Sequence, residues 1–196
     1  MKKLLHACLF LMTLQSYKSV AQDQAFGLRA GSNLSKIAIT NYKGPWFKYA
    51  IVPAYQFSGF VNTKLKNKIN LQTELSYSVK GWAEKTPSTY KMLFHYLTVP
   101  IILKYNLNKN IGIATGLEPS FMLNYKKYNL FTYRKWDLCA NAGIEFKLSS
   151  KISFELRYNH GLIPLTTLEN RDSQGHNQQT IGFSNRTLQT SLSYLF

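Results

Sequence analysis

The sequence predicts an all-β protein: an eight-stranded antiparallel up-and-down transmembrane β-barrel preceded by a signal peptide. Three observations lead to this prediction. Apolar and polar residues alternate over long runs, the connections between these runs alternate between long and short, and an apolar segment follows two lysines at the N-terminus. Barrel strands in outer membranes alternate in this way because one face meets lipid and the other faces the lumen. We expect a signal peptide at residues 1–21 and a barrel domain at residues 22–196.

The N-terminal segment has the parts of a secretory signal peptide. Lys2 and Lys3 supply positive charge, and the apolar stretch of residues 4–14 follows them. Small residues at 19–21 suit cleavage before Gln22. The apolar stretch is too short to cross a bilayer, which takes about 20 residues of helix. We therefore expect export with cleavage of this segment rather than anchoring by it.

Residues 69–80 illustrate the alternation of the barrel domain. The odd positions are apolar except for Thr73, whereas the even positions are all polar. A strand with a different solvent on each face has this pattern. Several predicted strands are much longer than the usual 5–6 or so residues of a soluble protein. The same pattern predicts eight strands, at residues 25–35, 49–63, 69–81, 94–107, 111–124, 135–148, 152–163 and 184–196.

The connections between these strands fit a barrel in an outer membrane. Short turns are expected at 64–68, 108–110 and 149–151, and long loops at 36–48, 82–93, 125–134 and 164–183. Outer-membrane barrels have short turns on the periplasmic side and long loops outside the cell. With an even number of strands, both ends of the barrel chain fall on the periplasmic side. Beyond the signal segment, no apolar run is long enough for a transmembrane helix.

Alternation alone does not decide which face points outward, and a soluble lipocalin-like barrel would bury its apolar face. Two features favour the membrane barrel. Charged residues that could pair in a narrow lumen share the polar face: Arg29, Glu74, Lys80, Lys104, Glu118, Asp137, Glu145, Lys147, Glu155 and Arg157. Aromatic residues near the outer strand ends predict an interfacial belt: Trp46, Phe47, Trp82, Phe94, Tyr125 and Trp136.

The chain is strongly basic, with a formal net charge of +15. Three of its lysines lie in the signal segment, which leaves +12 for the barrel. No nucleic-acid-binding motif is present, so the expected anionic partners are outer-membrane lipids and the phosphates of lipopolysaccharide. Lysines that are merely solvated on loops would give the same composition. Cys139 is the one cysteine outside the signal segment, so no intramolecular disulfide is expected.

The last predicted strand places Arg186, Leu188, Thr190, Leu192, Tyr194 and Phe196 on one face. An aromatic residue at the end of such a strand is similar to the signal that the barrel-assembly machinery reads. We therefore expect that machinery to be a partner of the C-terminal strand through Phe196.

Two stretches carry a resemblance to a known family. The run Leu-Gln-Thr-Glu-Leu-Ser-Tyr-Ser-Val-Lys-Gly at 71–81 and the run Tyr-Leu-Thr-Val-Pro-Ile-Ile-Leu-Lys-Tyr at 96–105 resemble the PorT-like outer-membrane β-barrel domain. Residues 137–146 and 157–162 resemble its sixth and seventh strands. Members are often labelled "porin family", and some relatives assist protein secretion. The resemblance implies a barrel in the Gram-negative envelope and implies no reaction.

The chemistry of barrel enzymes is not expected. His160 lies on the predicted lipid face near an outer strand end, where a lipid deacylase would hold its base, and a serine nucleophile would have to lie close by. Ser184 and Ser191 are on the neighbouring strand, but Ser191 points inward. The other histidines outside the signal segment, His95 and His176, complete no metal motif. We predict no catalytic, cofactor-binding or metal-binding residues, and no cofactor.

The expected function is that of a non-enzymatic envelope scaffold or an accessory of assembly or secretion, with envelope or secretion proteins as partners. A small-solute pore and a lipid-modifying enzyme are the alternatives. Eight strands leave an interior that side chains can fill, whereas open porins have about 16–18 strands. We expect a closed lumen, filled by Arg29, Gln56, Gln72, Glu74, Lys104, Glu118, Glu145, Glu155 and Arg157. The basic loop residues Lys126, Lys127 and Arg134 are the first place to expect a partner protein.

Overall fold

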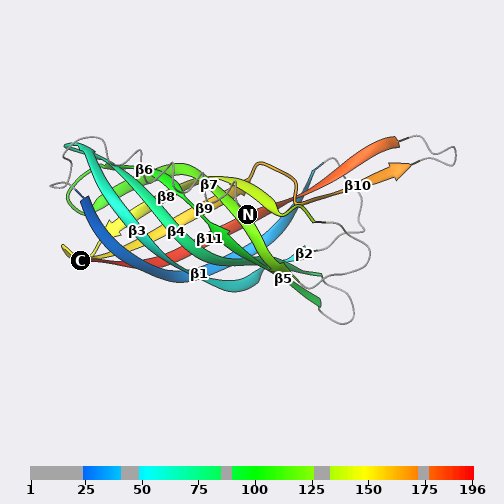
Figure 1. Cartoon of the computed structure of the whole chain (residues 1–196), viewed down its shortest axis with the longest axis horizontal. Coiled ribbons are helices and arrows are strands. Elements are labelled where there is room, and N and C mark those ends of the chain that lie inside the picture. The colour runs from blue at the N-terminus through cyan, green and yellow to red at the C-terminus, as the bar shows by residue number, and fades with distance from the viewer. Residues whose placement is uncertain (1–23, 41–48, 85–89, 126–132, 172–176) are drawn as a thin grey trace, which may run out of the picture.

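A computed structural model describes residues 24–40, 49–84, 90–125, 133–171 and 177–196. They form one long β-barrel whose strands are tilted relative to its axis (Figure 1). The predicted signal peptide at 1–21, with its cleavage before Gln22, lies outside the described residues. The strands are β1 (Gln24–Thr40), β2 (Tyr49–Ala50), β3 (Val52–Lys66), β4 (Ile69–Glu84), β5 (Tyr90–Thr98), β6 (Ile101–Asn106), β7 (Ile111–Tyr125), β8 (Trp136–Lys147), β9 (Ile152–Gly161), β10 (Thr166–Arg171) and β11 (Asn177–Leu195).

Eight positions around the ring make up the barrel, as the sequence predicts. The order is β1-β3-β4-β5-β7-β8-β9-β11, every pairing is antiparallel, and β1 closes the ring against β11 from Gly27↔Leu195 to Thr40↔Gly182. β6 continues β5, because both pair with β4 and β7. Pro100 has no N–H and interrupts this strand, but its carbonyl still accepts a hydrogen bond from the backbone N–H of Glu74 at 3.0 Å.

The segment predicted as a loop at 164–183 is the main difference from the sequence prediction. It contains β10 and the first part of β11, which pair as a hairpin and project beyond the barrel (Figure 1). β9 ends at Gly161, so the upper half of β11 would lack a partner on that side. β10 takes its place, which satisfies backbone groups that an unpaired edge would leave open. β1, β4 and β5 also extend farther into the predicted loops than expected.

The short turns predicted after β3, β6 and β8 are present, and they lie at the same end of the barrel as the C-terminus (Figure 1). The β10–β11 hairpin lies at the opposite end. Short turns mark the periplasmic side of an outer-membrane barrel, so the hairpin end is the extracellular end. Among the described residues, no helix is long and apolar enough to span a membrane.

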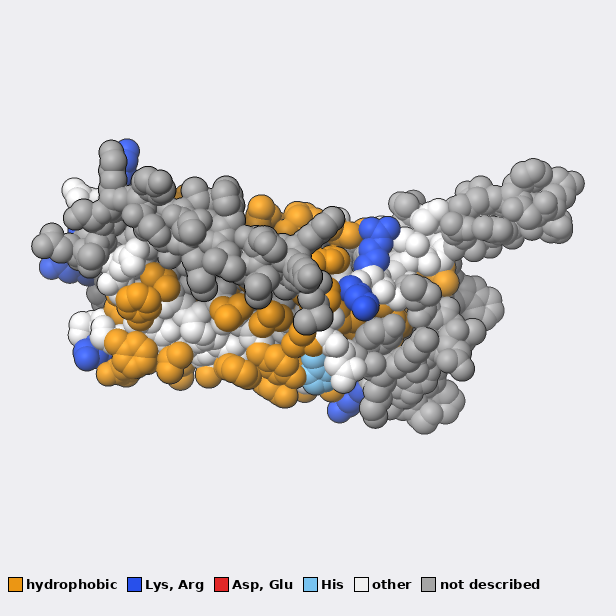
Figure 2. All heavy atoms as spheres, in the orientation of Figure 1, with side chains coloured by type: hydrophobic (Ala, Val, Ile, Leu, Met, Phe, Trp, Pro, Cys, Tyr) orange, Lys and Arg blue, Asp and Glu red, His pale blue; other side chains and the backbone are white. Residues whose placement is uncertain are grey.

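The barrel is apolar outside and polar inside. In Figure 2, most of the side chains on the uncovered part of the barrel wall are hydrophobic, and lysines and arginines lie toward both ends. Leu75 on β4 is 59% exposed, whereas its neighbour Glu74 is 5% exposed. Among the described residues, buried polar side chains outnumber buried apolar ones. A soluble protein has the opposite arrangement, with apolar side chains inside and polar side chains outside. The apolar exterior, which is stable in lipid, therefore decides against the lipocalin-like alternative.

The predicted aromatic belt is wrong at two of its members. Trp82 and Phe94 are 7% and 0% exposed and point into the barrel. Trp136, at 52% exposure, does face outward near the extracellular end of β8. The even positions of β4 and β5 face the lumen, so the register turns Trp82 and Phe94 inward together with Glu74. Trp46, Phe47 and the side chain of Tyr125 lie outside the described residues.

Candidate functional site in the barrel lumen

A network of buried ion pairs crosses the lumen in the periplasmic half of the barrel. Arg29 Nη1 donates to Glu74 Oε1 at 2.6 Å, and Arg29 Nη2 donates to Glu155 Oε2 at 2.9 Å. Arg157 bridges the same two carboxylates, with Nη2 2.9 Å from Glu74 and 2.5 Å from Glu155. Lys104 joins Glu155 at 2.8 Å and Glu145 at 2.6 Å. The three cations balance the three carboxylates, which is the condition for holding charge in a confined interior.

This network joins opposite walls of the barrel. β4 carries Glu74 and β9 carries Arg157, and these strands stand four positions apart in a ring of eight. β1 carries Arg29, which also donates through Nε to Ser193 Oγ at 2.9 Å. The side chains therefore close across the lumen. The predicted inward positions of all six charged residues, and their pairing, are confirmed.

A second polar layer lies farther toward the extracellular end. Lys80, six residues beyond Glu74 on β4, donates to Glu118 Oε1 at 2.5 Å. Asn159 Nδ2 donates to the other oxygen of Glu118 at 2.9 Å. Asp137, expected in the lumen, is there, but its partner is Asn185 Nδ2 at 2.7 Å rather than a cation. Each buried carboxylate of this layer thus accepts a hydrogen bond.

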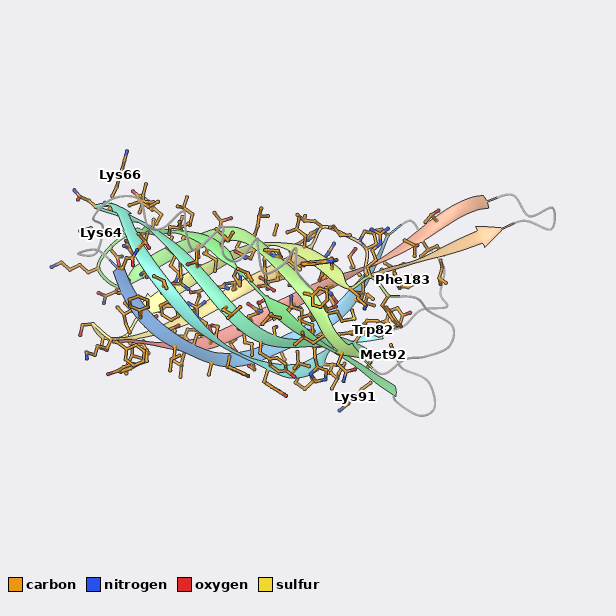
Figure 3. The ribbon with its side chains drawn as sticks, viewed as in Figure 1. Lys64, Lys66, Trp82, Lys91, Met92 and Phe183 are labelled. Atoms are coloured by element: carbon orange, nitrogen blue, oxygen red, sulfur yellow. The ribbon has the colours of Figure 1, made fainter. Side chains whose placement is uncertain are left out.

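An apolar cluster follows the second polar layer. It fills the extracellular end of the lumen with side chains from several strands, and Figure 3 labels its members Trp82, Met92 and Phe183. Trp82 stacks on Phe94 with ring centroids 5.0 Å apart. The cluster comprises Ile37, Trp82, Met92, Phe94, Tyr96, Met122, Tyr133, Leu165, Ile181 and Phe183. The lumen is therefore closed twice, by paired charges below and by packed apolar side chains above.

The sequence pattern did not predict this apolar cluster, although the sequence contains a signal for it. Alternation between apolar and polar residues stops at 92–94, where Met92, Leu93 and Phe94 are all apolar. In a barrel with a polar lumen, this loss of alternation indicates that the inner face has become apolar as well. Because residues 82–93 are predicted as a loop and Phe94 as part of the aromatic belt, the change of the inner face from polar to apolar is not predicted.

A cavity of about 440 Å³ occupies the periplasmic mouth of the lumen. Asn62, Asn70 and Gln72 line one side, and Lys147 and Ser153 line the other. Glu145 lies at its floor, where Lys104 and Ser153 bind the carboxylate. The lumen is thus open to the periplasm for a short distance and ends at the ion-pair network.

The residues considered for enzymatic chemistry do not come together. His160 is exposed on the outer wall, as predicted, but its cross-strand partners are Ala140 and Arg186. Ser184 pairs with Ala38 in the ladder, and Ser191 is buried in the lumen. No serine is therefore placed opposite His160 to act as a nucleophile.

The other histidines add no centre among the described residues. His95 Nδ1 lies 2.6 Å from the hydroxyl of Tyr77 on the outer wall. His176, with Lys126 and Lys127, lies outside the described residues. Within the described ranges, no group of three His, Cys, Asp or Glu side chains could hold a metal ion. Cys139 is a free thiol, buried in the lumen 3.6 Å from Asp137 Oδ2.

An apolar outer wall around a polar lumen, in an antiparallel ring of eight strands, defines a small integral β-barrel protein of the outer membrane. The model of the outer membrane protein beta-barrel domain family matches residues 20–167, and the chain belongs to this family. No curated protein sequence matches the chain.

Solved structures of small outer-membrane barrels share the fold. OprG of Pseudomonas aeruginosa is 11% identical, with a TM-score of 0.52 over 89% of this chain and 96% of its own. Neisserial surface protein A is 8% identical, with a TM-score of 0.52 over 87% of this chain and 97% of its own. Ail of Yersinia pestis is 11% identical, with a TM-score of 0.50 over 89% of this chain and all of its own. At these identities the likeness concerns the fold alone.

Proposed function

We propose that this protein is a non-conducting, non-enzymatic barrel that serves as an envelope scaffold or as an accessory of assembly or secretion. The observation that carries the proposal is the double closure of the lumen. Arg157 reaches Glu74 on the opposite wall, and the apolar cluster around Trp82 and Phe94 packs above it. A solute would have to separate buried ion pairs and also displace packed aromatic rings, and both steps are costly.

The PorT-like resemblance supports the accessory role within this proposal. The runs at 71–81 and 96–105 that carry it fall on the central barrel strands. We propose that residues 1–21 are removed during export, and that the barrel-assembly machinery recognises β11 and Phe196. Phe196 is 70% exposed, and its backbone N–H donates to the carbonyl of Phe26 at 2.9 Å, so its ring stays on the outer wall.

Recording from planar bilayers tests whether the barrel is closed. The folded protein is expected to give no reproducible single-channel steps. Stable steps that disappear on unfolding would favour the small-pore alternative. A Glu74→Ala/Arg157→Ala variant should also stay silent, although it widens the lumen at the ion-pair layer, because the apolar cluster above that layer is unchanged. Protein secretion and outer-membrane composition in a deletion strain then test the accessory role.

A further inference from the structure

A row of three basic side chains lies on the outer wall of the barrel. Lys36 on β1 stands opposite Arg186 on β11, and Arg186 stands opposite His160 on β9. The side chains of Lys36 and His160 are exposed, and that of Arg186 is half-buried. Residues directly opposite in neighbouring strands have Cβ atoms about 4.5–5.5 Å apart. The register therefore places the three basic side chains side by side on three adjacent strands.

The surroundings of this row contain no balancing charge among the described residues. The next outward row toward the periplasm is Leu34, Leu188 and Tyr158, and the next toward the outside begins with Ala38 and Ser184. Beyond His160, the row continues to Ala140 on β8. None of the three basic residues forms a salt bridge with a described carboxylate. Like charges directly opposite one another destabilise a sheet, so the row favours an anion.

Arg186 is held in place for such an anion. Its Nη1 donates to the carbonyls of Gly161 and Asn185, both at 3.0 Å. These bonds fix the guanidinium against the wall and leave its other N–H groups for a ligand. A guanidinium with a fixed orientation suits the paired oxygens of a phosphate.

The height of the row in the membrane indicates which phosphate it would meet. The same three strands carry outward apolar residues near their periplasmic ends. These residues are Leu28 on β1, Tyr194 on β11 and Ile152 on β9, and they pair with one another in register. Lys36, Arg186 and His160 each lie eight residues farther along their strands. Eight residues of tilted strand rise by about 20 Å, close to the roughly 25 Å of the apolar band of such barrels. The row therefore lies at the headgroup level of the outer leaflet.

We propose that Lys36, Arg186 and His160 form a binding site for a phosphate group of lipopolysaccharide in the outer leaflet. The site is on the wall, outside the lumen, so it is independent of whether the barrel conducts. Lipid acyl chains would lie along the apolar row of Leu34, Leu188 and Tyr158 directly below. Phosphatidylglycerol carries a single phosphodiester, whereas the lipid A headgroup presents phosphate monoesters with more charge for the row to bind.

The test measures binding of purified lipopolysaccharide to the folded protein in a zwitterionic detergent. The row variant is Lys36→Gln/Arg186→Gln, and His160→Gln is measured separately. The matched control is Lys91→Gln/Lys135→Gln, which removes the same formal charge from exposed residues near the same barrel end. Each lost contact between exposed charges weakens binding about two- to threefold. We expect about five- to tenfold weaker binding for the row variant, a smaller loss for His160→Gln, and less than a twofold change for the control.

Three results would overturn the proposal: equal losses in the row and control variants, equal binding of dephosphorylated lipopolysaccharide, or equal competition by phosphatidylglycerol vesicles. A stability measurement adds a second readout. The row variant loses the two hydrogen bonds of Arg186 in any membrane, so its loss of stability relative to the wild type is compared between two membranes. The loss should be larger in bilayers that contain lipopolysaccharide than in purely phosphatidylcholine bilayers. An equal loss in the two membranes would contradict the site.

Discussion

At the scale of single residues, Glu155 is the centre of the ion-pair network. Its two oxygens accept from Arg29, Lys104 and Arg157, and the side chain is fully buried. Removing this carboxylate leaves three buried cations to share two carboxylates. An unbalanced buried charge is far more destabilising than the intact pair is stabilising.

Glu155→Gln is therefore expected to lower the free energy of unfolding by about 3–5 kcal/mol. Urea titration of the folded protein in lipid vesicles measures the change. Glu145→Gln is the matched control, because Glu145 pairs with Lys104 alone among the cations and lines the periplasmic cavity. Glu145→Gln should lower the free energy of unfolding clearly less than Glu155→Gln does. Equal decreases for the two variants would show that the central position of Glu155 in the network does not matter for stability.

Phe196 tests a different property, assembly. The ring packs edge-on against Tyr194 with centroids 5.6 Å apart on the outer wall. Phe196→Asp places a charge where lipid or an assembly factor would meet an aromatic ring, and it should reduce the amount of folded barrel in outer membranes several-fold. Phe196→Tyr keeps the ring and should assemble normally. An unchanged amount of folded Phe196→Asp barrel in outer membranes would contradict the proposed role of Phe196 in assembly.

At the scale of elements, successive side chains of β5 point alternately into the apolar cluster and out to the lipid-facing wall. Phe94 is completely buried in the apolar cluster, whereas its neighbour Leu93 is 38% exposed on the outer wall. The cluster thus behaves as the core of a soluble protein that lies inside a membrane barrel. Its side chains come from β1, β4, β5, β7 and β11 and from the connections before β8 and β10, so it ties the wall to the extracellular segments.

Phe94→Ala should cost about 3–5 kcal/mol of unfolding free energy, because it opens a cavity in a packed cluster. Leu93→Ala on the same strand should cost much less, since lipid can occupy the space that its side chain leaves. Urea titration in vesicles measures both variants. Both should remain silent in planar bilayers, because the ion-pair layer below is unchanged. A conducting Phe94→Ala variant would mean that the cluster alone closes the barrel.

At the scale of the whole molecule, the closed ring predicts the behaviour of an integral barrel. Within the barrel itself, the backbone pairings of the eight wall positions run around the ring from β1 back to β11, so the membrane-spanning wall has no free edge from which unfolding could begin. The mature protein should fractionate with outer membranes. It should also migrate differently on gels before and after boiling, because the folded barrel resists detergent. Recovery as a soluble periplasmic protein would contradict the fold.

The sequence by itself determined the ring of eight strands, its short turns and its two faces. Period-two alternation follows directly from the geometry of a strand, so residues such as Leu75 and Glu74 could be assigned to opposite faces without a structure. The inward charges could be assigned for the same reason, and Arg29, Glu74, Glu155 and Arg157 are where the pattern predicts them.

The tertiary structure alone decided how those faces are used. Pairing partners such as Arg157 and Glu74 lie 83 residues apart, and the ring brings them together across the lumen. The register of adjacent strands aligned Lys36, Arg186 and His160 on the wall. The inward turn of Trp82 and Phe94, and the hairpin of β10 with β11, also depended on which strands extend beyond their neighbours. Local alternation predicts the face on which a residue lies. It does not predict the spatial neighbours of that residue, because pairings between strands distant in sequence determine them.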